Sequence, residues 1–197
     1  MKSYPSIKRF KRDPIKLHTF DKQDGSNLRF EYSKKRGWYK FGTRKRLFDE
    51  TDPVFGEAIS LFFNTLADKL EKKIKSDRLI VFGEFVGEKS FAGLHKKDDP
   101  KTIYVIDVAV YKKGLLPPEE FLNMFGEFAP KYLGNISWNQ DFIKQIKDSE
   151  LDITFEGVVG KRQKKKQIEM YKLKTDQWIR KVYDLYGKAR GDVIVSS

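Results

Sequence analysis

Three lysine side chains have the types and the spacing to do chemistry on a phosphate group. Lys172 and Lys174 end the alternating run 167–174, which predicts a strand, so their ammonium groups point to the same face. Lys22 ends a short apolar run just before the turn formers of residues 24–26. A lysine attacks only as the neutral amine, and neighbouring cations disfavour its charged form. The pair could therefore bind a phosphate and help to deprotonate Lys22, although each of these lysines alone is typical of a solvated strand or turn.

Three acidic residues stand in runs that predict strands. Glu84 and Asp107 lie within apolar runs, and Glu156 lies within an alternating run. A carboxylate is costly to bury unless it has partners. For an isolated Glu84, an exposed carboxylate at a strand end is the commoner alternative.

The elements that must position these residues predict an α+β fold. Strand follows strand across the loop 88–101 with no helix between them, which argues against a doubly wound parallel sheet. Asp52 and Pro53 predict the start of the longest helix, because Asp is a good N-cap and Pro suits the first helical position. The predicted elements are a hairpin of residues 17–20 and 28–32, strands at 38–42, 79–87, 102–111, 151–160 and 167–174, a basic turn at 161–166, and helices at 53–75, 116–128, 139–147 and 175–186.

The composition favours a protein that binds a polyanion. With 40 Lys and Arg against 28 Asp and Glu, the 197-residue chain has a formal net charge of +12, which attracts polyanions through counterion release and steering. No basic amphipathic segment of the membrane-surface kind stands out, so nucleic acid is the expected partner and a membrane is not. The absence of cysteine excludes disulfides, thiolate zinc sites and cysteine nucleophiles. No signal-peptide core or membrane-spanning run is present, and a cytoplasmic protein is expected.

Four fragments resemble, in the right order, the nucleotidyltransferase motifs of the ATP-dependent ligases and mRNA capping enzymes. They are residues 21–27, 81–85, 156–161 and 171–174. The resemblance covers about residues 17–180, and the ordered set is specific although each fragment alone is weak. The expected fold is α+β, with two packed, twisted, mostly antiparallel β-sheets that form a nucleotide cleft and flanking helices outside.

The resemblance implies a role for each residue expected at the nucleotide. Lys22 matches the lysine that forms a phosphoramide with AMP, and Asp21 matches the position that contacts the adenine amino group. Glu84 matches the carboxylate that holds the ribose hydroxyl. At Ile106 the family often has an aromatic residue on the adenine, so an aliphatic face would take that place. Asn27 is also expected to bind the nucleotide. It stands where typical DNA ligases have an arginine, and this difference favours the RNA ligase branch, including enzymes that seal nicks in duplex RNA.

The other matched residues concern the phosphates, the metal and the nucleic acid. Glu156 matches the acidic residue that engages the divalent metal through water. Lys172 and Lys174 match the phosphate-binding pair of the last motif. In the family, an arginine shortly after the lysine motif contacts the nucleotide or the nucleic-acid end. Arg44 is expected in that role with Arg46 behind it, on a segment that could otherwise be a solvated loop.

The resemblance therefore implies a minimal ATP-dependent RNA ligase that uses ATP with Mg²⁺ or Mn²⁺. Lys22 would become adenylylated, AMP would pass to a 5′-phosphate RNA end or nick, and a 3′-hydroxyl would displace it. Asp107 also resembles an extra strand motif of that branch. The alternatives are a minimal ligase for DNA or RNA–DNA hybrids, a GTP-dependent capping enzyme and, in another class, a non-catalytic nucleic-acid-binding module.

The length of 197 residues suits one domain. We expect residues 1–197 to form a single nucleotidyltransferase domain, without the OB-fold or helical domain that ligases normally append. A protein partner could supply the missing domain.

Overall fold

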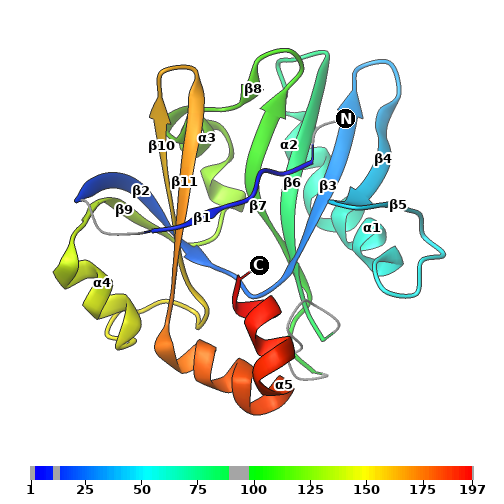
Figure 1. Ribbon diagram of the computed structural model, residues 1–197. Coiled ribbons are helices and arrows are strands. Elements are labelled where there is room, and N and C mark those ends of the chain that lie inside the picture. The colour runs from blue at the N-terminus through cyan, green and yellow to red at the C-terminus, as the bar shows by residue number, and fades with distance from the viewer. Residues whose placement is uncertain (1–2, 11–13, 89–97, 197) are drawn as a thin grey trace. The chain divides into compact units, whose positions relative to one another are not determined.

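The described part of the chain contains two mostly antiparallel sheets with flanking helices, which confirms the α+β class (Figure 1). The structure is a computed structural model. It describes residues 3–10, 14–88 and 98–196. The chain divides into two compact units, of which the first is Met1–Pro5 with Gly25–Ala129 and the second is Ser6–Asp24 with Pro130–Ser197. The expectation of a single nucleotidyltransferase domain stays a prediction.

The first unit is built on a six-stranded sheet with the order β5-β4-β3-β6-β7-β8, in which all neighbouring strands are antiparallel. The strands are β3 (Ser26–Ser33), β4 (Gly37–Thr43), β5 (Leu47–Phe48), β6 (Arg78–Val86), β7 (Thr102–Val110) and β8 (Gly114–Leu115). The helices are α1 (Gly56–Phe62), the π-helix η1 (Phe63–Ala67), α2 (Asp68–Glu71), α3 (Pro118–Phe125) and the 3-10 helix η3 (Gly126–Phe128). Phe30 of β3 stacks on Phe62 of α1 with the ring centroids 4.1 Å apart, so aromatic packing joins this helix to the sheet.

The first helical stretch differs from the single helix that the sequence predicts at 53–75. Asp52 accepts hydrogen bonds from the backbone N–H groups of Val54 and Phe55, at 3.0 and 2.9 Å. Asp52 therefore caps a turn, and the helix begins later than expected, at Gly56. The stretch then passes through η1 before α2, and a π-turn interrupts the regular helical period. Phe63, the first residue of η1, is 44% exposed.

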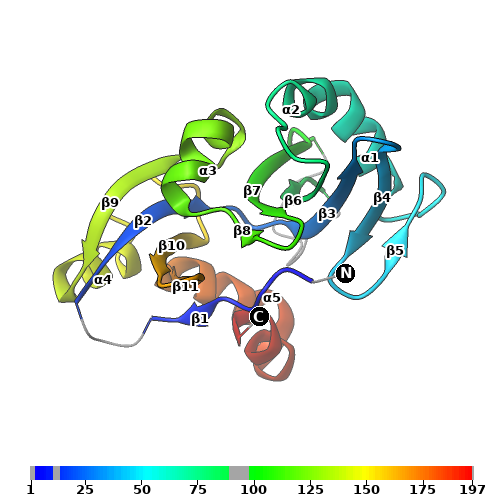
Figure 2. The same cartoon turned by 90° about the horizontal axis from the view of Figure 1, so that it is seen from above.

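The second unit is built on a five-stranded sheet with the order β1-β11-β10-β2-β9. Its strands are β1 (Lys8–Arg9), β2 (Ile15–Lys22), β9 (Tyr132–Trp138), β10 (Gly157–Lys164) and β11 (Gln167–Lys174). β1 pairs with β11 in parallel and the other pairs are antiparallel; Figure 2 shows β2 beside β9. The helices are α4 (Gln140–Lys147) and α5 (Asp176–Ser196), which is kinked at Gly187. No helix in residues 3–10, 14–88 or 98–196 is long and apolar enough to span a membrane.

The hairpin predicted around residues 24–26 is wrong. β2 pairs with β9 and β10, whereas β3 pairs with β4 and β6. The two strands therefore belong to different sheets, and residues 23–25 connect those sheets. A local turn signal cannot reveal this, because the partners of both strands are distant in the sequence.

The hairpin predicted from strands 151–160 and 167–174 is confirmed, but its first strand begins later, at Gly157, and its turn is shorter. β10 continues to Lys164, and β11 begins at Gln167. Only Lys165, with a φ of +55°, and Lys166 form the turn. The basic turn predicted at 161–166 is therefore wrong for its first four residues. The sequence pattern also fails to predict β9.

One face of the second sheet packs against α4. The buried cluster consists of Leu17, Trp138, Phe142, Ile146, Val158 and Leu173. Burial of such side chains contributes roughly 1.5–3 kcal/mol each. Asn139 caps α4, since its side chain accepts a hydrogen bond from the Phe142 N–H at 2.9 Å. Because side chains alternate along a strand, the residues between the core positions point to the other face.

Candidate active site

The second sheet places Lys22 and Lys174 on either side of one glycine. Gly157 of β10 pairs with Lys22 of β2 and with Lys174 of β11. Its φ is +142°, and a Cβ at this position would lie 2.0 Å from the carbonyl oxygen of Leu173. Only glycine tolerates this backbone and this close approach. No side chain therefore stands between the two lysines in the sheet.

Glu156 joins these two lysines. Its Oε2 accepts from Lys22 Nζ at 2.8 Å, and its Oε1 accepts from Lys174 Nζ at 3.0 Å. The Glu156 side chain is 4% exposed, so these charges interact with little screening by water. The backbone supports the arrangement, because the Thr175 N–H donates to the Glu156 carbonyl oxygen at 3.0 Å.

Lys172 adds a third cation beside Lys22 and Lys174. We call Lys22, Lys172, Lys174 and Glu156 the lysine group. Its pKa is lowered to about 8, first by burial and then by the charges of Lys174 and Lys22. Burial also lowers the pKa of Lys174, an effect that Glu156 opposes. The charges of the three lysines are opposed by that of Glu156 and, for Lys174, also by that of Asp24, so positive charge is in excess in this buried place. Such an excess favours an anionic ligand such as a phosphate.

Helix α5 contributes further partners to Lys174. The Lys174 Nζ lies 4.1 Å from the centroid of the Trp178 ring, a distance at which a cation is attracted to the ring face. The Trp178 Nε1–H donates to Asp24 Oδ2 at 3.2 Å. The carbonyl oxygen of Ile194 accepts from Lys174 Nζ at 3.5 Å. The end of α5, where a helix carries partial negative charge, thus contacts the lysine group.

Asp21 is buried and held by protein partners. Its Oδ1 accepts from Thr154 Oγ1 at 2.7 Å, and its Oδ2 accepts from the Thr154 N–H at 3.0 Å and from Gln23 Nε2 at 3.1 Å. Burial raises the pKa of Asp21, and the hydrogen bonds of Thr154 oppose this effect. The carboxylate ties the segment before Glu156 to the end of β2. The contact of Asp21 with adenine stays a prediction.

The first sheet carries the residues expected at the ribose and the base. Asn27 of β3 pairs with Glu84 of β6. Ile106 lies where the register between β6 and β7 shifts. Gly25 allows the chain to pass close to β6, because a Cβ there would lie 2.6 Å from the carbonyl oxygen of Phe85. The sheet thus makes Asn27 and Glu84 neighbours, and their contact with a nucleotide stays a prediction.

Tyr4 is a buried residue of the first unit that no sequence pattern singles out. Its hydroxyl donates a hydrogen bond to Asp107 Oδ2. The pKa of Tyr4 is raised well above its ordinary value, first by burial and then by Asp107, with a smaller effect of Glu84. Arg44 donates to the carbonyl oxygen of Pro5 at 3.3 Å, and its guanidinium lies 5.9 Å from the Tyr4 ring centroid. Arg44 and Asp107 therefore both contact the N-terminal segment, which has no periodicity that could have indicated this.

Arg46 forms an ion pair with Asp52, the residue that caps the turn before α1. This partner holds the pKa of Asp52 well below its usual range. The structure thus gives Arg46 a role in fixing that turn. Its expected role behind Arg44 at the nucleic acid stays a prediction.

Lys161 is a buried cation that the sequence interpretation missed. It is 4% exposed, and its Nζ lies 5.0 Å from the centroid of the Phe20 ring. β10 continues through this residue, so Lys161 shares a face with Val159, which pairs with Lys172. The alternation of Gly157, Val159 and Lys161 is the signal that could have identified it.

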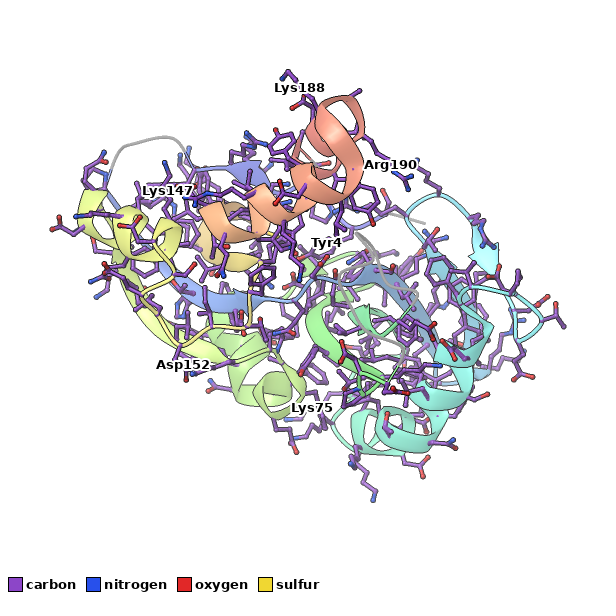
Figure 3. All side chains as sticks on the ribbon, turned by 90° about the horizontal axis from the view of Figure 1, so that it is seen from below. Tyr4, Lys75, Lys147, Asp152, Lys188 and Arg190 are labelled. Carbon is purple, nitrogen blue, oxygen red and sulfur yellow. The ribbon has the colours of Figure 1, made fainter. Side chains whose placement is uncertain are left out.

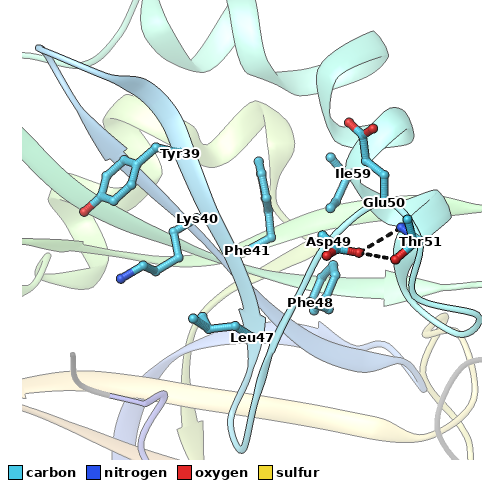
Figure 4. Close-up of a pocket in the computed structure, with 9 residues that line it drawn as sticks. All are labelled: Tyr39, Lys40, Phe41, Leu47, Phe48, Asp49, Glu50, Thr51 and Ile59. Carbon is cyan, nitrogen blue, oxygen red and sulfur yellow. Dashed lines mark hydrogen bonds between the residues drawn. The ribbon is translucent and has the colours of Figure 1, made fainter.

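A pocket of about 510 Å³ lies in the first unit, beside β4 and β5 (Figure 4). Within it, Asp49 accepts hydrogen bonds from the N–H and the hydroxyl of Thr51. Its lining is Tyr39, Lys40, Phe41, Leu47, Phe48, Asp49, Glu50, Thr51 and Ile59. None of the residues predicted at the active site lines this pocket.

Glu156 is the residue of the lysine group that could engage a metal. Within residues 3–10, 14–88 and 98–196, no three His, Cys, Asp or Glu side chains are grouped as a metal site. Mg²⁺ usually keeps several waters and binds through one or two carboxylates together with substrate phosphates. A buried carboxylate beside several lysines fits that mode of binding.

The chain matches known proteins in sequence and in structure. The family model for RNA ligases matches residues 17–176. An archaeal ATP-dependent RNA ligase has 17% identity and a TM-score of 0.67, over 99% of this chain and 56% of that one. A Naegleria gruberi RNA ligase with pyrophosphate has 16% identity and a TM-score of 0.66, over 93% and 60% of the two chains. A mutant of the Naegleria gruberi enzyme with ATP and Mn has 18% identity and a TM-score of 0.63, over 86% and 52%.

No curated protein matches the chain. The chain spans 52–60% of the length of these solved structures. Because these solved structures are only 16–18% identical to the chain, they show the fold alone. The family model, in contrast, matches most of the sequence. The ordered motifs, the convergence of Lys22, Lys172 and Lys174 on Glu156, and this match lead to one conclusion: the protein belongs to the RNA ligase family.

Proposed function

We propose that the protein is an ATP-dependent RNA ligase whose first step is the adenylylation of Lys22. The neutral amine of Lys22 attacks the α-phosphorus of ATP, an N–P bond forms, and the P–O bond to the departing pyrophosphate breaks. AMP then passes to the 5′-phosphate of an RNA end. A 3′-hydroxyl attacks that activated end, a phosphodiester forms and AMP leaves. The observation that supports this proposal most is that Lys22 and Lys174 share the buried carboxylate of Glu156.

The positive charge around Lys22 supports the first step in two ways. Lys172 and Lys174 oppose the charged form of the Lys22 amine, which must be neutral to attack, whereas the ion pair with Glu156 favours the charged form. They also attract the phosphates and the negative charge that develops on them during transfer. The lowered pKa values of both lysines, caused first by burial, indicate that their positive charges are disfavoured in this buried place. A bound polyphosphate would compensate them.

ATP and Mg²⁺ or Mn²⁺ are the proposed cofactors. The Naegleria gruberi RNA ligase structure with ATP and Mn supports this choice. Glu156 would hold the hydrated cation, which neutralises phosphate charge when it is bound. In the structure Glu156 is paired with Lys22 and Lys174. When phosphates bind those lysines, the Glu156 carboxylate would be released to take another partner.

The remaining residue roles are proposals that rest on the family motifs. Glu84 would accept hydrogen bonds from ribose hydroxyls, and Ile106 would face the adenine. The other residues expected at the nucleotide or the RNA end are Asp21, Asn27, Arg44 and Arg46.

RNA ends or nicks are the proposed substrates. The family match and the net charge of +12 support an RNA partner. DNA or an RNA–DNA hybrid as substrate, a protein partner that completes the enzyme, and a cytoplasmic location stay predictions.

Covalent labelling with α-labelled ATP tests the first step. Incubation with Mg²⁺ should label the protein, and Lys22→Ala should abolish the label. Labelling by GTP in place of ATP would support a capping enzyme, and sealing of nicked DNA in preference to nicked RNA would support a DNA ligase. A wild-type protein that takes no label, or a Lys22→Ala variant that keeps it, would refute the proposal.

A further inference from the structure

The face of the second sheet that carries Lys22 continues along β2 with two aromatic rings and a further lysine. Counting back from Lys22, every second residue is Phe20, His18 and Lys16. The residues between them belong to the other face, where Leu17 is fully buried in the core against α4. Phe20, His18 and Lys16 therefore share the face of the proposed nucleophile.

Tyr132 of β9 joins this row from the neighbouring strand. It pairs with Phe20, and the two ring centroids lie 5.2 Å apart. The His18 ring stacks on Tyr132 with an interplanar angle of 22°, and the Tyr132 hydroxyl lies 2.9 Å from His18 Nδ1. Two neighbours thus fix the orientation of Tyr132, yet 39% of it is exposed. An aromatic ring held in place before binding loses little conformational entropy when a ligand stacks on it.

The row also carries positive charge. Lys161 of β10 pairs with His18 in the register and lies over the Phe20 ring, and Lys16 is exposed at the start of β2. Cations that follow a backbone, combined with exposed rings on a sheet, are the means by which proteins bind single-stranded nucleic acid. In this row Lys16 and Tyr132 are exposed and His18 is half-buried, whereas Phe20 and Lys161 are buried beside them. We call Lys16, His18, Phe20, Tyr132 and Lys161 the aromatic track.

We propose that the aromatic track binds the first nucleotides of the RNA strand that carries the 5′-phosphate, with one base stacked on His18 and Tyr132. This inference rests on the proposed function, because the 5′-phosphate must approach the AMP on Lys22. The nucleotides behind that phosphate then lie within a short distance of Lys22. His18 is four residues from Lys22, which corresponds to about 13 Å along a strand. Positive charge and aromatic surface continue along β2 in this direction.

Transfer of AMP to RNA tests the track separately from the first step. Enzyme–AMP is formed with α-labelled ATP and mixed with a short 5′-phosphorylated RNA, and the transfer rate is divided by the rate of self-adenylylation for each variant. Tyr132→Ala should lower this ratio by roughly 5- to 150-fold, the range expected for the loss of one base stack. Tyr132→Phe, which keeps the ring, should retain most of the ratio. Lys16→Ala should weaken RNA binding, and its matched control is Lys147→Ala on α4 (Figure 3).

A binding measurement without ATP separates failure of the track from failure of the proposed function. An RNA with 2-aminopurine near its 5′-phosphate should lose fluorescence on binding the wild type and Tyr132→Phe, and should lose much less on binding Tyr132→Ala. If the proposed function fails because Lys22 takes no label, this quenching still reports on the track. Equal transfer ratios and equal quenching for the wild type and Tyr132→Ala would overturn the proposal for the aromatic track. In that case, a covalent label on the wild type that is lost in Lys22→Ala would still support the proposed function.

Discussion

Replacement of Lys172 by methionine should make the protein more stable and inactive. Methionine keeps an unbranched side chain of similar length and removes the charge, which burial and two neighbouring lysines oppose. The fall of the Lys172 pKa from 10.5 to about 8 corresponds to roughly 3 kcal/mol at neutral pH. For a chain of this size, such a gain raises the melting temperature by roughly 6–12 °C.

The pH dependence gives this prediction its sign. Below about pH 8 Lys172 is charged in both the folded and the unfolded protein, so its full cost is present there. Between about pH 8 and 10.5 the unfolded chain holds more protons than the folded one, and the stability of the wild type rises with pH. The advantage of Lys172→Met should therefore be largest below pH 8 and should fade as the pH approaches 10.5.

Urea denaturation across this pH range, with ATP absent, is the assay. Lys166→Met, in the exposed turn of the same hairpin, is the control and should change the free energy of unfolding by at most a few tenths of a kcal/mol. A Lys172→Met variant that is less stable than the wild type at pH 7, or an advantage that does not depend on pH, would show that the charge of Lys172 is compensated within the protein. The reasoning about excess positive charge would then be wrong.

Three further substitutions test the structure around these sites. Glu156→Gln should lower the free energy of unfolding by about 3–5 kcal/mol in urea denaturation, because it leaves buried lysines without a carboxylate. Its control is Glu169→Gln, which breaks the more exposed ion pairs with Arg162 and Lys164 on the same sheet and should cost at most about 1 kcal/mol. Gly157→Ala should abolish the folded state in thermal melting, because its Cβ would meet backbone at 2.0 Å, whereas Gly37→Ala, with open space around it, should cost only about 1 kcal/mol of backbone strain. Tyr4→Phe should cost about 1–3 kcal/mol in the same melting experiment, since it leaves a buried carboxylate without its hydroxyl donor.

Each of these predictions has an outcome that contradicts it. Equal losses for Glu156→Gln and Glu169→Gln would mean that burial does not strengthen the Glu156 pairs. A folded Gly157→Ala would show that β10 and β11 do not approach as closely as the structure has them. A Tyr4→Phe variant as stable as the wild type would mean that Asp107 does not need the tyrosine hydroxyl.

The lysine group illustrates what local sequence patterns can predict. A strand alternates its side chains with a period of two, so Lys172 and Lys174 had to share a face wherever their strand was placed. The same rule places Lys161 on one face with Gly157 and Val159 of its own strand, but the run of basic residues suggested a turn. The hydrophilic character of this run hid the alternation that is typical of a strand. Burial of a lysine depends on what surrounds it in the folded protein and not on its neighbours in sequence.

The pairing of strands illustrates what local patterns cannot predict. The turn formers after Lys22 are real, yet β2 and β3 separate into two sheets. β9 lies beside β2 although more than one hundred residues separate them in sequence. Pairing is decided by side chains that meet only in the folded chain, and a short turn signal contains no information about them.

The sequence by itself determined the α+β class, the basic character, the ordered family motifs and the common face of Lys172 and Lys174, because composition and periodicity are local properties. Only the tertiary structure decided that Glu156 bridges Lys22 and Lys174, that Tyr4 contacts Asp107, and that His18 and Tyr132 stack beside Phe20. Each of these contacts joins residues distant in the chain. Their formation depends on strand register and on burial, which arise only when the whole sheet assembles.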